Sequence, residues 1–245
     1  MTLKPILSLE NVHKDFGGVS AVNGMDLSLM PGELRALVGP NGCGKSTLFN
    51  LITGVLRPSS GCIRLDGIDI AGLAPHRIAR LGVGRKFQVP AVFGELTVAQ
   101  NLDLGRGAAD RWGPDALGGD ADADLVERIH LAKRISHPAA VLSHGERQWL
   151  EIGMVLAARP RLLLLDEPTA GMTGPETATT VDLIRDVASA GDVTILVIEH
   201  DTGFLERLDC QVTVMAKGRV LTSGAYGAIR GDADVRALYF GAGAA

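Results

Sequence analysis

The sequence predicts an α/β fold with a mostly parallel, buried sheet. Short apolar runs alternate along the chain with longer segments in which apolar residues recur at helical spacing. Residues 162–165 and 193–198 are continuously apolar, as strands of a parallel sheet are when both faces are buried. Both runs end in acidic or ionisable residues, and binding sites of α/β folds lie at such strand ends.

The amino-terminal part predicts an antiparallel start. Residues 6–12 and 22–29 are typical of strands, with a turn at Gly17 and Gly18 between them. Residues 33–38 predict a further strand, after which a glycine-rich loop leads into a helix.

The middle of the chain predicts helices. Residues 87–159 contain few strand signals, so we expect a helical subdomain inserted into the α/β core. Within it, residues 124–135 and 146–159 have the periodicity of helices. Residues 105–124 are rich in Gly, Ala and Asp and predict a surface loop that buries little.

Composition excludes several classes of protein. Of 245 residues, 46% are hydrophobic, which is enough for a sizeable core and excludes a disordered chain. No run approaches the roughly 20 apolar residues of a membrane-spanning helix, and the amino terminus lacks the apolar region of a secretory signal. We therefore expect a cytoplasmic location.

Charge and cysteine content narrow the possible partners. The net charge of −4 and an aromatic content of 4% argue against nucleic acid as a partner. Cys43, Cys62 and Cys210 have neither disulfide nor zinc-site spacing, and we expect them to be reduced thiols.

A phosphate-binding motif follows the strand predicted at residues 33–38. Residues 39–46 fit G-x-x-x-x-G-K-[ST] and lie between a strand and a helix, as this motif requires. Backbone N–H groups of such a loop surround phosphates, Lys45 reaches the β- and γ-phosphates, and the Ser46 hydroxyl can bind Mg²⁺. The alternative is a glycine-rich turn with an exposed lysine. The residues predicted to bind nucleotide here are Gly39, Pro40, Asn41, Gly42, Cys43, Gly44, Lys45, Ser46 and Thr47.

Two adjacent carboxylates follow the apolar run at residues 162–165. Asp166 ends the run and is the candidate Mg²⁺ ligand, as in the Walker B arrangement. Glu167 is then the candidate catalytic base, because a carboxylate beside the γ-phosphate can accept a proton from an attacking water. As an isolated feature, an acidic strand end is usually a solvated turn.

The segment at residues 142–146 has two compatible interpretations. Ser143 and Glu146 are spaced as a capping box that starts the helix predicted at residues 146–159. A capped helix terminus that presents Ser143 and the Gly145 amide is also an anion site, suited to a phosphate from another subunit.

In their order along the chain, these motifs resemble those of the ATP-binding subunits of ABC transporters. The resemblance adds Gln88 after a predicted strand, places residues 142–146 at the LSGGQ motif, and adds His200 after the second apolar run. It covers roughly residues 9–241, except residues 105–124.

The resemblance implies a P-loop NTPase fold, with an antiparallel β subdomain and an inserted helical subdomain. Residues 1–245 would form a single ABC ATPase domain. Residues 1–86 and 160–245 would form the α/β core with its amino-terminal β subdomain, and residues 87–159 the helical subdomain.

The resemblance also implies an ATP hydrolase that works as a head-to-tail dimer. Two ATP molecules would lie between the Walker A loop of one subunit and the LSGGQ-like loop of the other. Ser143, Gly145 and Glu146 would therefore contact the partner's nucleotide.

Further roles follow by motif. Phe16 would stack on adenine, although a lone Phe can equally be a core residue. Gln88 would sense Mg²⁺ and the γ-phosphate, as a metal ligand and catalytic residue. His200 would contact the γ-phosphate and act with Glu167 in catalysis.

The chain departs from the family pattern at three positions. His144 and Glu146 replace the Gly and Gln of LSGGQ, and Glu146 would disfavour phosphate binding unless it turns back to cap its own helix. Thr173 replaces the usual Asp of the D-loop. With Pro175 and Glu176 it forms a second possible capping box, so the intersubunit role of this segment is in doubt.

Within the family, the chain resembles the branched-chain amino acid and urea import subgroup. Residues 143–145, 148–154 and 170–173 are more similar to the urea or short-chain amide transporter's ATP-binding subunit, so uptake of those solutes is the expected function. Uptake of branched-chain amino acids is the alternative. A non-transport ABC ATPase, as in iron–sulfur assembly, and an unrelated P-loop kinase or GTPase are further alternatives.

The resemblance names partners and a location. Transmembrane permease subunits would bind at residues 88–95, where Val89, Pro90, Val92 and Phe93 offer an apolar surface, unless these four fill the subdomain core. The second ATPase would be another ABC subunit or a second copy of this chain. A periplasmic solute-binding protein would act indirectly, and the chain would lie peripherally on the cytoplasmic face of the inner membrane.

Overall fold

The structure is a computed structural model that describes residues 4–86, 92–106 and 120–235, without the side chains of 120–122. Its strands are β1 (Leu7–Phe16), β2 (Val19–Leu29), β3 (Leu34–Val38), β4 (Ser60–Leu65), β5 (Ile68–Asp69), β6 (Val83–Lys86), β7 (Leu162–Asp166), β8 (Thr194–Ile198), β9 (Gln211–Ala216) and β10 (Arg219–Ala225). Its helices are α1 (Lys45–Ile52), α2 (Pro75–Arg80), α3 (Val98–Gly105), α4 (Asp120–Arg128), α5 (His144–Ala157), α6 (Gly174–Ser189), α7 (Thr202–Leu208) and α8 (Tyr226–Gly231), with 3₁₀ turns η2 (Ala132–Arg134) and η3 (Ala139–Val141).

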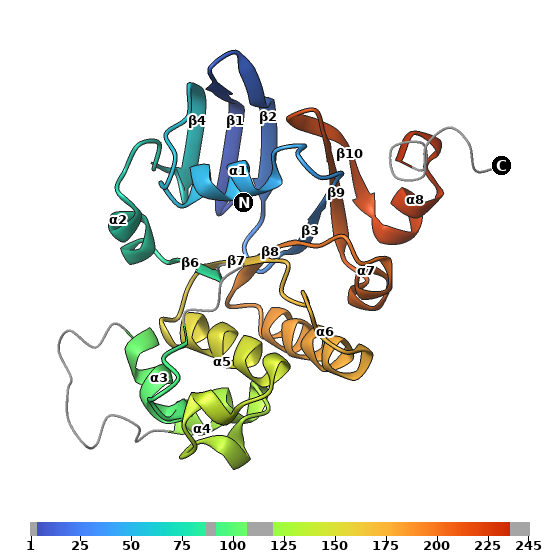
Figure 1. Cartoon of the computed structure of the whole chain (residues 1–245). Coiled ribbons are helices and arrows are strands. Elements are labelled where there is room, and N and C mark those ends of the chain that lie inside the picture. The colour runs from blue at the N-terminus through green and yellow to red at the C-terminus, as the bar shows by residue number, and fades with distance from the viewer. Residues whose placement is uncertain (1–3, 87–91, 107–119, 236–245) are drawn as a thin grey trace.

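The predicted antiparallel start is confirmed. In the described part of the chain, four strands form an antiparallel sheet in the order β2-β1-β4-β5 (Figure 1). Phe16 pairs with Val19 across the turn at Gly17 and Gly18. β1 runs four residues beyond the predicted end at Val12, and a bulge just before Val12 accommodates the register shift.

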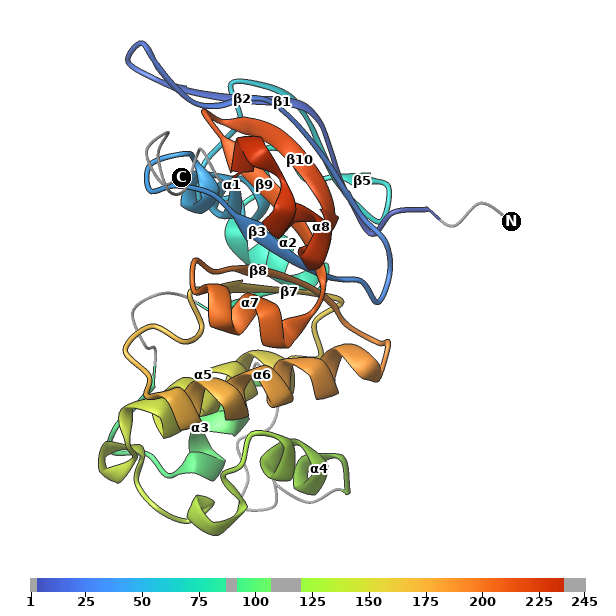
Figure 2. The ribbon, with the colours of Figure 1, turned by 90° about the vertical axis from the view of Figure 1, so that its right-hand side faces the viewer.

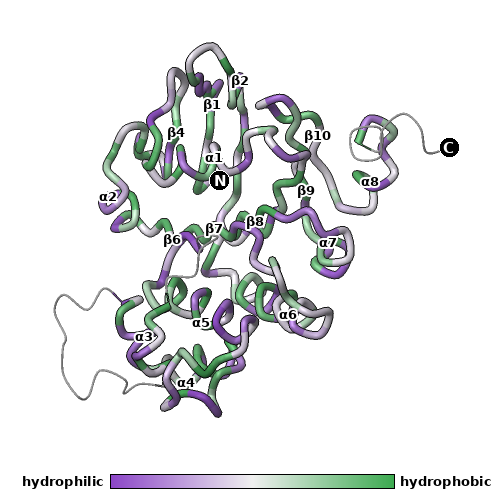
Figure 3. The backbone as a smooth tube through the Cα atoms, in the orientation of Figure 1, coloured by the Kyte–Doolittle hydropathy of each residue, from purple (hydrophilic) through white to green (hydrophobic). Residues whose placement is uncertain are grey.

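A second sheet carries the predicted parallel strands. Among the described residues its order is β10-β9-β3-β8-β7-β6, in which β10 is antiparallel to β9 and the other neighbours are parallel. The two apolar runs are its strands β7 and β8, as predicted. Both are buried along their whole length, and β8 and β9 are largely coloured as hydrophobic in Figure 3.

Alternate residues of β7 enter two different cores. Leu162 and Leu164 pack in a core that also contains α1 and the antiparallel sheet. Leu163 and Leu165 pack in a second core with α3, α5 and α6. Figure 2 shows the result as layers, with the parallel strands between α5 and α6 on one side and the antiparallel sheet on the other.

The helical middle differs from prediction in detail. The helix expected at residues 124–135 is confirmed only as far as Arg128, where α4 ends, and a separate 3₁₀ turn follows at Ala132–Arg134. His130 between them has φ +58°, a left-handed conformation that ends the helix and lets both Ile129 and Leu131 be buried. α4 also begins at Asp120, inside the expected surface loop.

The helix expected at residues 146–159 is α5, which begins two residues earlier at its capping box. The division of the chain at residues 87 and 159 stays a prediction. No helix in the described ranges combines the length and the apolar character needed to cross a bilayer.

A buried ion pair joins the parallel sheet to α5. Lys86, the last residue of β6, has its ammonium 3.6 Å from a carboxylate oxygen of Glu151 on α5. Both side chains are almost completely buried, and burial lowers the pKa of Lys86 in spite of the opposing carboxylate. The pair therefore fixes α5 against the strand end that leads to residue 88.

We predict that this pair is costly to break on one side. Glu151→Gln removes the charge of the carboxylate that lies 3.6 Å from a buried ammonium and should lower the free energy of unfolding by about 3–5 kcal/mol, whereas Lys86→Met with Glu151→Met should be neutral or stabilising. Denaturant unfolding followed by circular dichroism measures both. Glu206→Gln breaks the exposed pair with Arg230 and is the control, expected to cost at most about 1 kcal/mol. Equal losses for Glu151→Gln and Glu206→Gln would contradict the prediction.

Candidate active site

The candidate site forms where three adjacent parallel strands end. β8 lies between β3 and β7. Its last residue, Ile198, pairs with Leu37 of β3 on one side and with Asp166 of β7 on the other. The segments that follow these strands therefore emerge side by side at one edge of the sheet. They are the glycine-rich loop, the Asp166-Glu167 pair and the segment that begins with Glu199.

The glycine-rich loop is shaped by close backbone contacts. Gly44 precedes α1 with φ +107°, and a Cβ at this position would collide with the carbonyl oxygen of Ala21 in β2. The N–H of Gly218 donates to the carbonyl of Cys43 at 3.1 Å, which ties the loop to the β9–β10 turn. Burial raises the pKa of the Cys43 thiol in spite of the neighbouring Lys45.

Lys45 lies within this loop. Its ammonium donates to the carbonyls of Gly39 at 2.6 Å and Pro40 at 3.1 Å, and its side chain is buried. Ser46 is exposed, whereas Thr47 is half-buried. The loop thus holds a positive charge beside the open amino terminus of α1.

Asp166 is oriented by an arginine that sequence analysis did not identify. Arg85 of β6 lies 3.0 Å from Oδ2 of Asp166 and is itself held by Asn50 at 2.6 Å and by the ring of Phe49. Oδ1 of Asp166 is buried and has no hydrogen-bond partner among the described residues. This oxygen is available to a cation.

Glu167 and His200 face each other at the edge of the sheet. Oε1 of Glu167 lies 3.7 Å from Nδ1 of His200, and both side chains are accessible. Glu167 has φ +48°, which is uncommon for a residue with a side chain and is found at functional sites. Its N–H donates to the carbonyl of Ile198 at 3.0 Å, so the backbone fixes it beside β8.

Glu199 is a positioning residue that sequence analysis missed. It is 1% exposed and accepts hydrogen bonds from the N–H and hydroxyl of Thr169 and from the N–H of His200. It thereby joins the segment after β7 to the segment after β8. The only signal in the sequence is an acidic residue at the end of an apolar strand.

The LSGGQ-like segment is capped as predicted. Ser143 accepts from the N–H of Glu146, whose carboxylate accepts from the N–H of Ser143 at 2.8 Å. The other carboxylate oxygen of Glu146 lies 3.3 Å from Arg134 of the η2 turn, so the charge of Glu146 is paired within the chain. His144 contacts the carbonyl of Ala170 at 3.0 Å.

The predicted site residues fall into separate groups. The loop at residues 39–47 adjoins α1, which packs in one core, whereas Ser143, Gly145 and Glu146 belong to α5, which packs in the other (Figures 1 and 2). Phe16 is 45% exposed at the end of β1 with the ammonium of Lys14 at 5.0 Å from its ring centre, so it is not a core residue. Gln88 lies outside the described residues.

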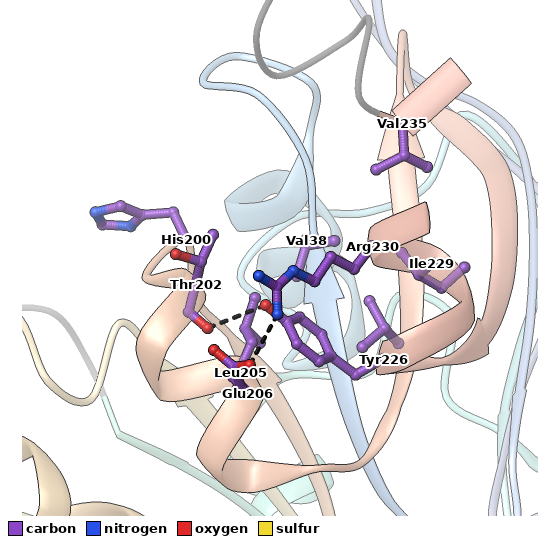
Figure 4. Close-up of a pocket in the computed structure, with 10 residues that line it drawn as sticks. Val38, His200, Thr202, Leu205, Glu206, Tyr226, Ile229, Arg230 and Val235 are labelled. Carbon is purple, nitrogen blue, oxygen red and sulfur yellow. Dashed lines mark hydrogen bonds and ion pairs between the residues drawn. The ribbon is translucent and has the colours of Figure 1, made fainter. Parts of the chain in front are cut away.

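A cavity of about 450 Å³ lies between α7 and α8 (Figure 4). Its lining is mainly apolar, with Tyr226 bonded to the Thr202 carbonyl and Arg230 paired with Glu206 at its edge. The ring of His200 points away from the other lining residues in this view. Val38, the residue before the glycine-rich loop, also lines the cavity, so the cavity adjoins the candidate site.

Comparison with known proteins shows similarity along most of the chain. Residues 22–170 match the family model described as ABC transporter. The chain is 36% identical to "High-affinity branched-chain amino acid transport ATP-binding protein BraF" of Pseudomonas aeruginosa, over 97% of this chain and 98% of that protein. It is 35% identical to the similarly described LivG of Escherichia coli, with the same coverage.

Solved structures agree with this fold. The ADP conformation of MJ1267, an ATP-binding cassette of an ABC transporter, matches with a TM-score of 0.84 and 29% identity, over 97% of this chain and 99% of that chain. A nucleotide-free ATP-binding cassette from an ABC transporter matches with a TM-score of 0.81, 29% identity and the same coverage.

We predict that two glycines of the loop differ in their tolerance of a side chain. Gly44→Ala places Cβ against the Ala21 carbonyl, whereas a Cβ at Gly42 meets nothing within 4 Å. Gly42 has φ +78°, so Gly42→Ala should cost only the backbone strain of about 1–2 kcal/mol, and Gly44→Ala should cost clearly more. Unfolding of both variants without nucleotide measures the difference, and equal costs would disprove the steric explanation.

Proposed function

The chain belongs to the ABC transporter family as an ATP-hydrolysing importer subunit, and we propose that it powers uptake of branched-chain amino acids. The observation that carries the proposal is the similarity to BraF over 97% of the chain, because it extends well beyond the nucleotide-binding motifs. Urea or short-chain amides are the second candidate, favoured by the local similarity of residues 143–145, 148–154 and 170–173. The solute does not contact this kind of subunit, so the site geometry does not select between them.

Nucleotide binding is assigned to the loop at residues 39–47. Its backbone N–H groups and the amino terminus of α1 favour phosphate oxygens. On binding, the ammonium of Lys45 exchanges the carbonyls of Gly39 and Pro40 for the β- and γ-phosphates. Phe16 is exposed and lies at the hairpin end, as stacking on adenine requires.

The donor set fits a magnesium ion. Oδ1 of Asp166 is buried and lacks a hydrogen-bond partner in the described part of the chain, and the Ser46 hydroxyl is exposed. Mg²⁺ typically takes one or two protein oxygens and completes its shell with phosphates and water, so a larger acidic cluster is not needed. Ser46, Asp166 and Gln88 would hold it, and it would neutralise charge on the phosphates.

Glu167 is assigned as the general base. Its half-buried but accessible carboxylate can accept a proton from a water that attacks the γ-phosphate, while His200 donates a hydrogen bond to that phosphate. Glu199 holds the backbone of His200 and thereby keeps both groups at the same edge.

The second half of each nucleotide site is assigned to a partner subunit. Ser143 caps α5 and Gly145 lies in its first turn, across the sheet from α1, and this separation supports a contact with the ATP of a second copy or of another ABC ATPase. Glu146 caps its own helix instead of approaching that nucleotide.

The permease is assigned to the surface around residues 88–95. Phe93 is 56% exposed, while buried Asn101 bonds to both its N–H and its carbonyl and fixes its orientation. Val92 instead packs against the core, and Val89 and Pro90 lie outside the described residues. Docking here would hold the chain on the cytoplasmic face of the membrane, with a periplasmic solute-binding protein acting through the permease.

We predict that Glu167→Gln and Lys45→Ala impair different steps, hydrolysis in the first and ATP binding in the second. Glu167→Gln removes the base and should lower ATP hydrolysis by about 10²- to 10⁴-fold while ATP binding is kept. Lys45→Ala removes a phosphate contact and should weaken ATP binding by about 10- to 100-fold. Phosphate release and calorimetric titration with ATP measure the two effects, with exposed Glu127→Gln as control. Unchanged hydrolysis in Glu167→Gln would remove Glu167 from the catalytic role.

We predict that cells of the native host carrying Glu167→Gln in place of the wild-type chain lose uptake of labelled leucine and keep uptake of labelled urea. The variant should bind ATP without turnover, so the transporter it serves should stop. Loss of urea uptake alone would favour the second candidate. No change in either, with the chain still present at normal level, would favour a non-transport ABC ATPase.

A further inference from the structure

We propose that Glu176 of α6 occupies the anion position at the amino terminus of α5 and must leave it before the partner's ATP binds there. The inference rests on the proposed function, because it takes this terminus as the place where the γ-phosphate of a second subunit binds. It adds a residue that sets the ATP concentration at which the ATP-bound dimer forms.

The carboxylate of Glu176 reaches α5 from a different helix. The hydroxyl of Ser143 donates to its Oε1 at 3.4 Å. Gly145 lies so close beneath it that a Cβ on Gly145 would collide with the carboxyl group. Glu176 therefore contacts Ser143 and Gly145, two of the three residues retained from the LSGGQ pattern.

Helix geometry explains why a carboxylate is favoured there. The free N–H groups and the dipole of a helix amino terminus stabilise a negative charge. Hydrogen bonds from Thr173 lower the pKa of Glu176 most, and Ser143 and the N–H of Gly145 lower it further, so Glu176 is ionised at neutral pH. The other nearby acid, Glu146, has its carboxylate on the N–H of Ser143 and on Arg134.

A phosphate cannot share this position with Glu176. Both are anions, and both need the Ser143 hydroxyl and the Gly145 N–H as donors. The two carboxylate oxygens divide their contacts, since Oε2 accepts from the N–H and hydroxyl of Thr173 at 2.9 and 2.8 Å. Rotation about this anchor frees Ser143 and Gly145 while α6 keeps its cap. Displacing Glu176 is thus a cost of closing the dimer, and not a loss of the fold.

The test uses the full chain with Glu167→Gln, in which bound ATP should persist. Light scattering follows dimer formation against ATP concentration, with and without Glu176→Gln. Glutamine can still accept from Thr173 but carries no charge. We expect Glu176→Gln to lower the ATP concentration at half-dimerisation by about two- to fivefold per site, and the difference to shrink as salt is raised.

Asp182→Asn is the matched control, because it removes one negative charge from an exposed position of the same helix. Equal ATP dependence in Glu176→Gln and Asp182→Asn, or a need for more ATP in Glu176→Gln, would overturn the inference alone. If no chain dimerises at any ATP concentration, the homodimeric sandwich fails, and the inference falls with it. Dimerisation that appears only with Glu176→Gln would support both the homodimeric sandwich and the role of Glu176. Thermal unfolding without ATP checks that Glu176→Gln keeps its fold.

Discussion

Because β3, β8 and β7 are adjacent and parallel, the segments that follow them leave the sheet at one edge, and that alignment brings together Lys45, Asp166, Glu167 and His200. The strands are buried on both faces, so a register shift of one residue would move an entire row of leucines into the wrong core. Glu199 then connects the segments that follow two of these strands, β7 and β8. A buried carboxylate must be fully hydrogen-bonded, and the donors that satisfy it come from Thr169 and His200. Its burial cost is thereby used to join two catalytic segments.

The same sheet separates the two groups of residues that we assign to phosphate binding. The Lys45 loop belongs to the core that contains α1, and the capped terminus with Ser143 belongs to the core that contains α5. With the sheet between them, one chain does not bring both halves to the same phosphate. The layering of the fold thus supports the proposal that a second subunit completes each nucleotide site.

Features set by neighbours in the sequence were predicted well, and features set by distant contacts were not. The two capping boxes at Ser143 and Thr173 and the strands β7 and β8 follow from short patterns, and the structure has them. Arg85 meets Asp166 across 81 positions of the chain, and no local pattern indicates that contact. The end of the helix before His130 was missed for a related reason, because no reliable sequence pattern predicts where a residue other than glycine takes a left-handed conformation.

The expectation of urea as the transported solute rested on short segments, and similarity over the full length favours branched-chain amino acids instead.

One departure from LSGGQ, His144, helps to attach α5 to the chain that follows β7. A Gly at position 144 could not reach the carbonyl of Ala170, but the ring of His144 does, at 3.0 Å. Further along α5, the indole of Trp149 donates to Thr180 of α6 at 2.9 Å. With the contact between Ser143 and Glu176, α5 is thus attached at three places to the stretch of chain that follows β7. That stretch begins with Glu167. Short contacts therefore connect the segment that carries Glu167 to the amino-terminal part of α5.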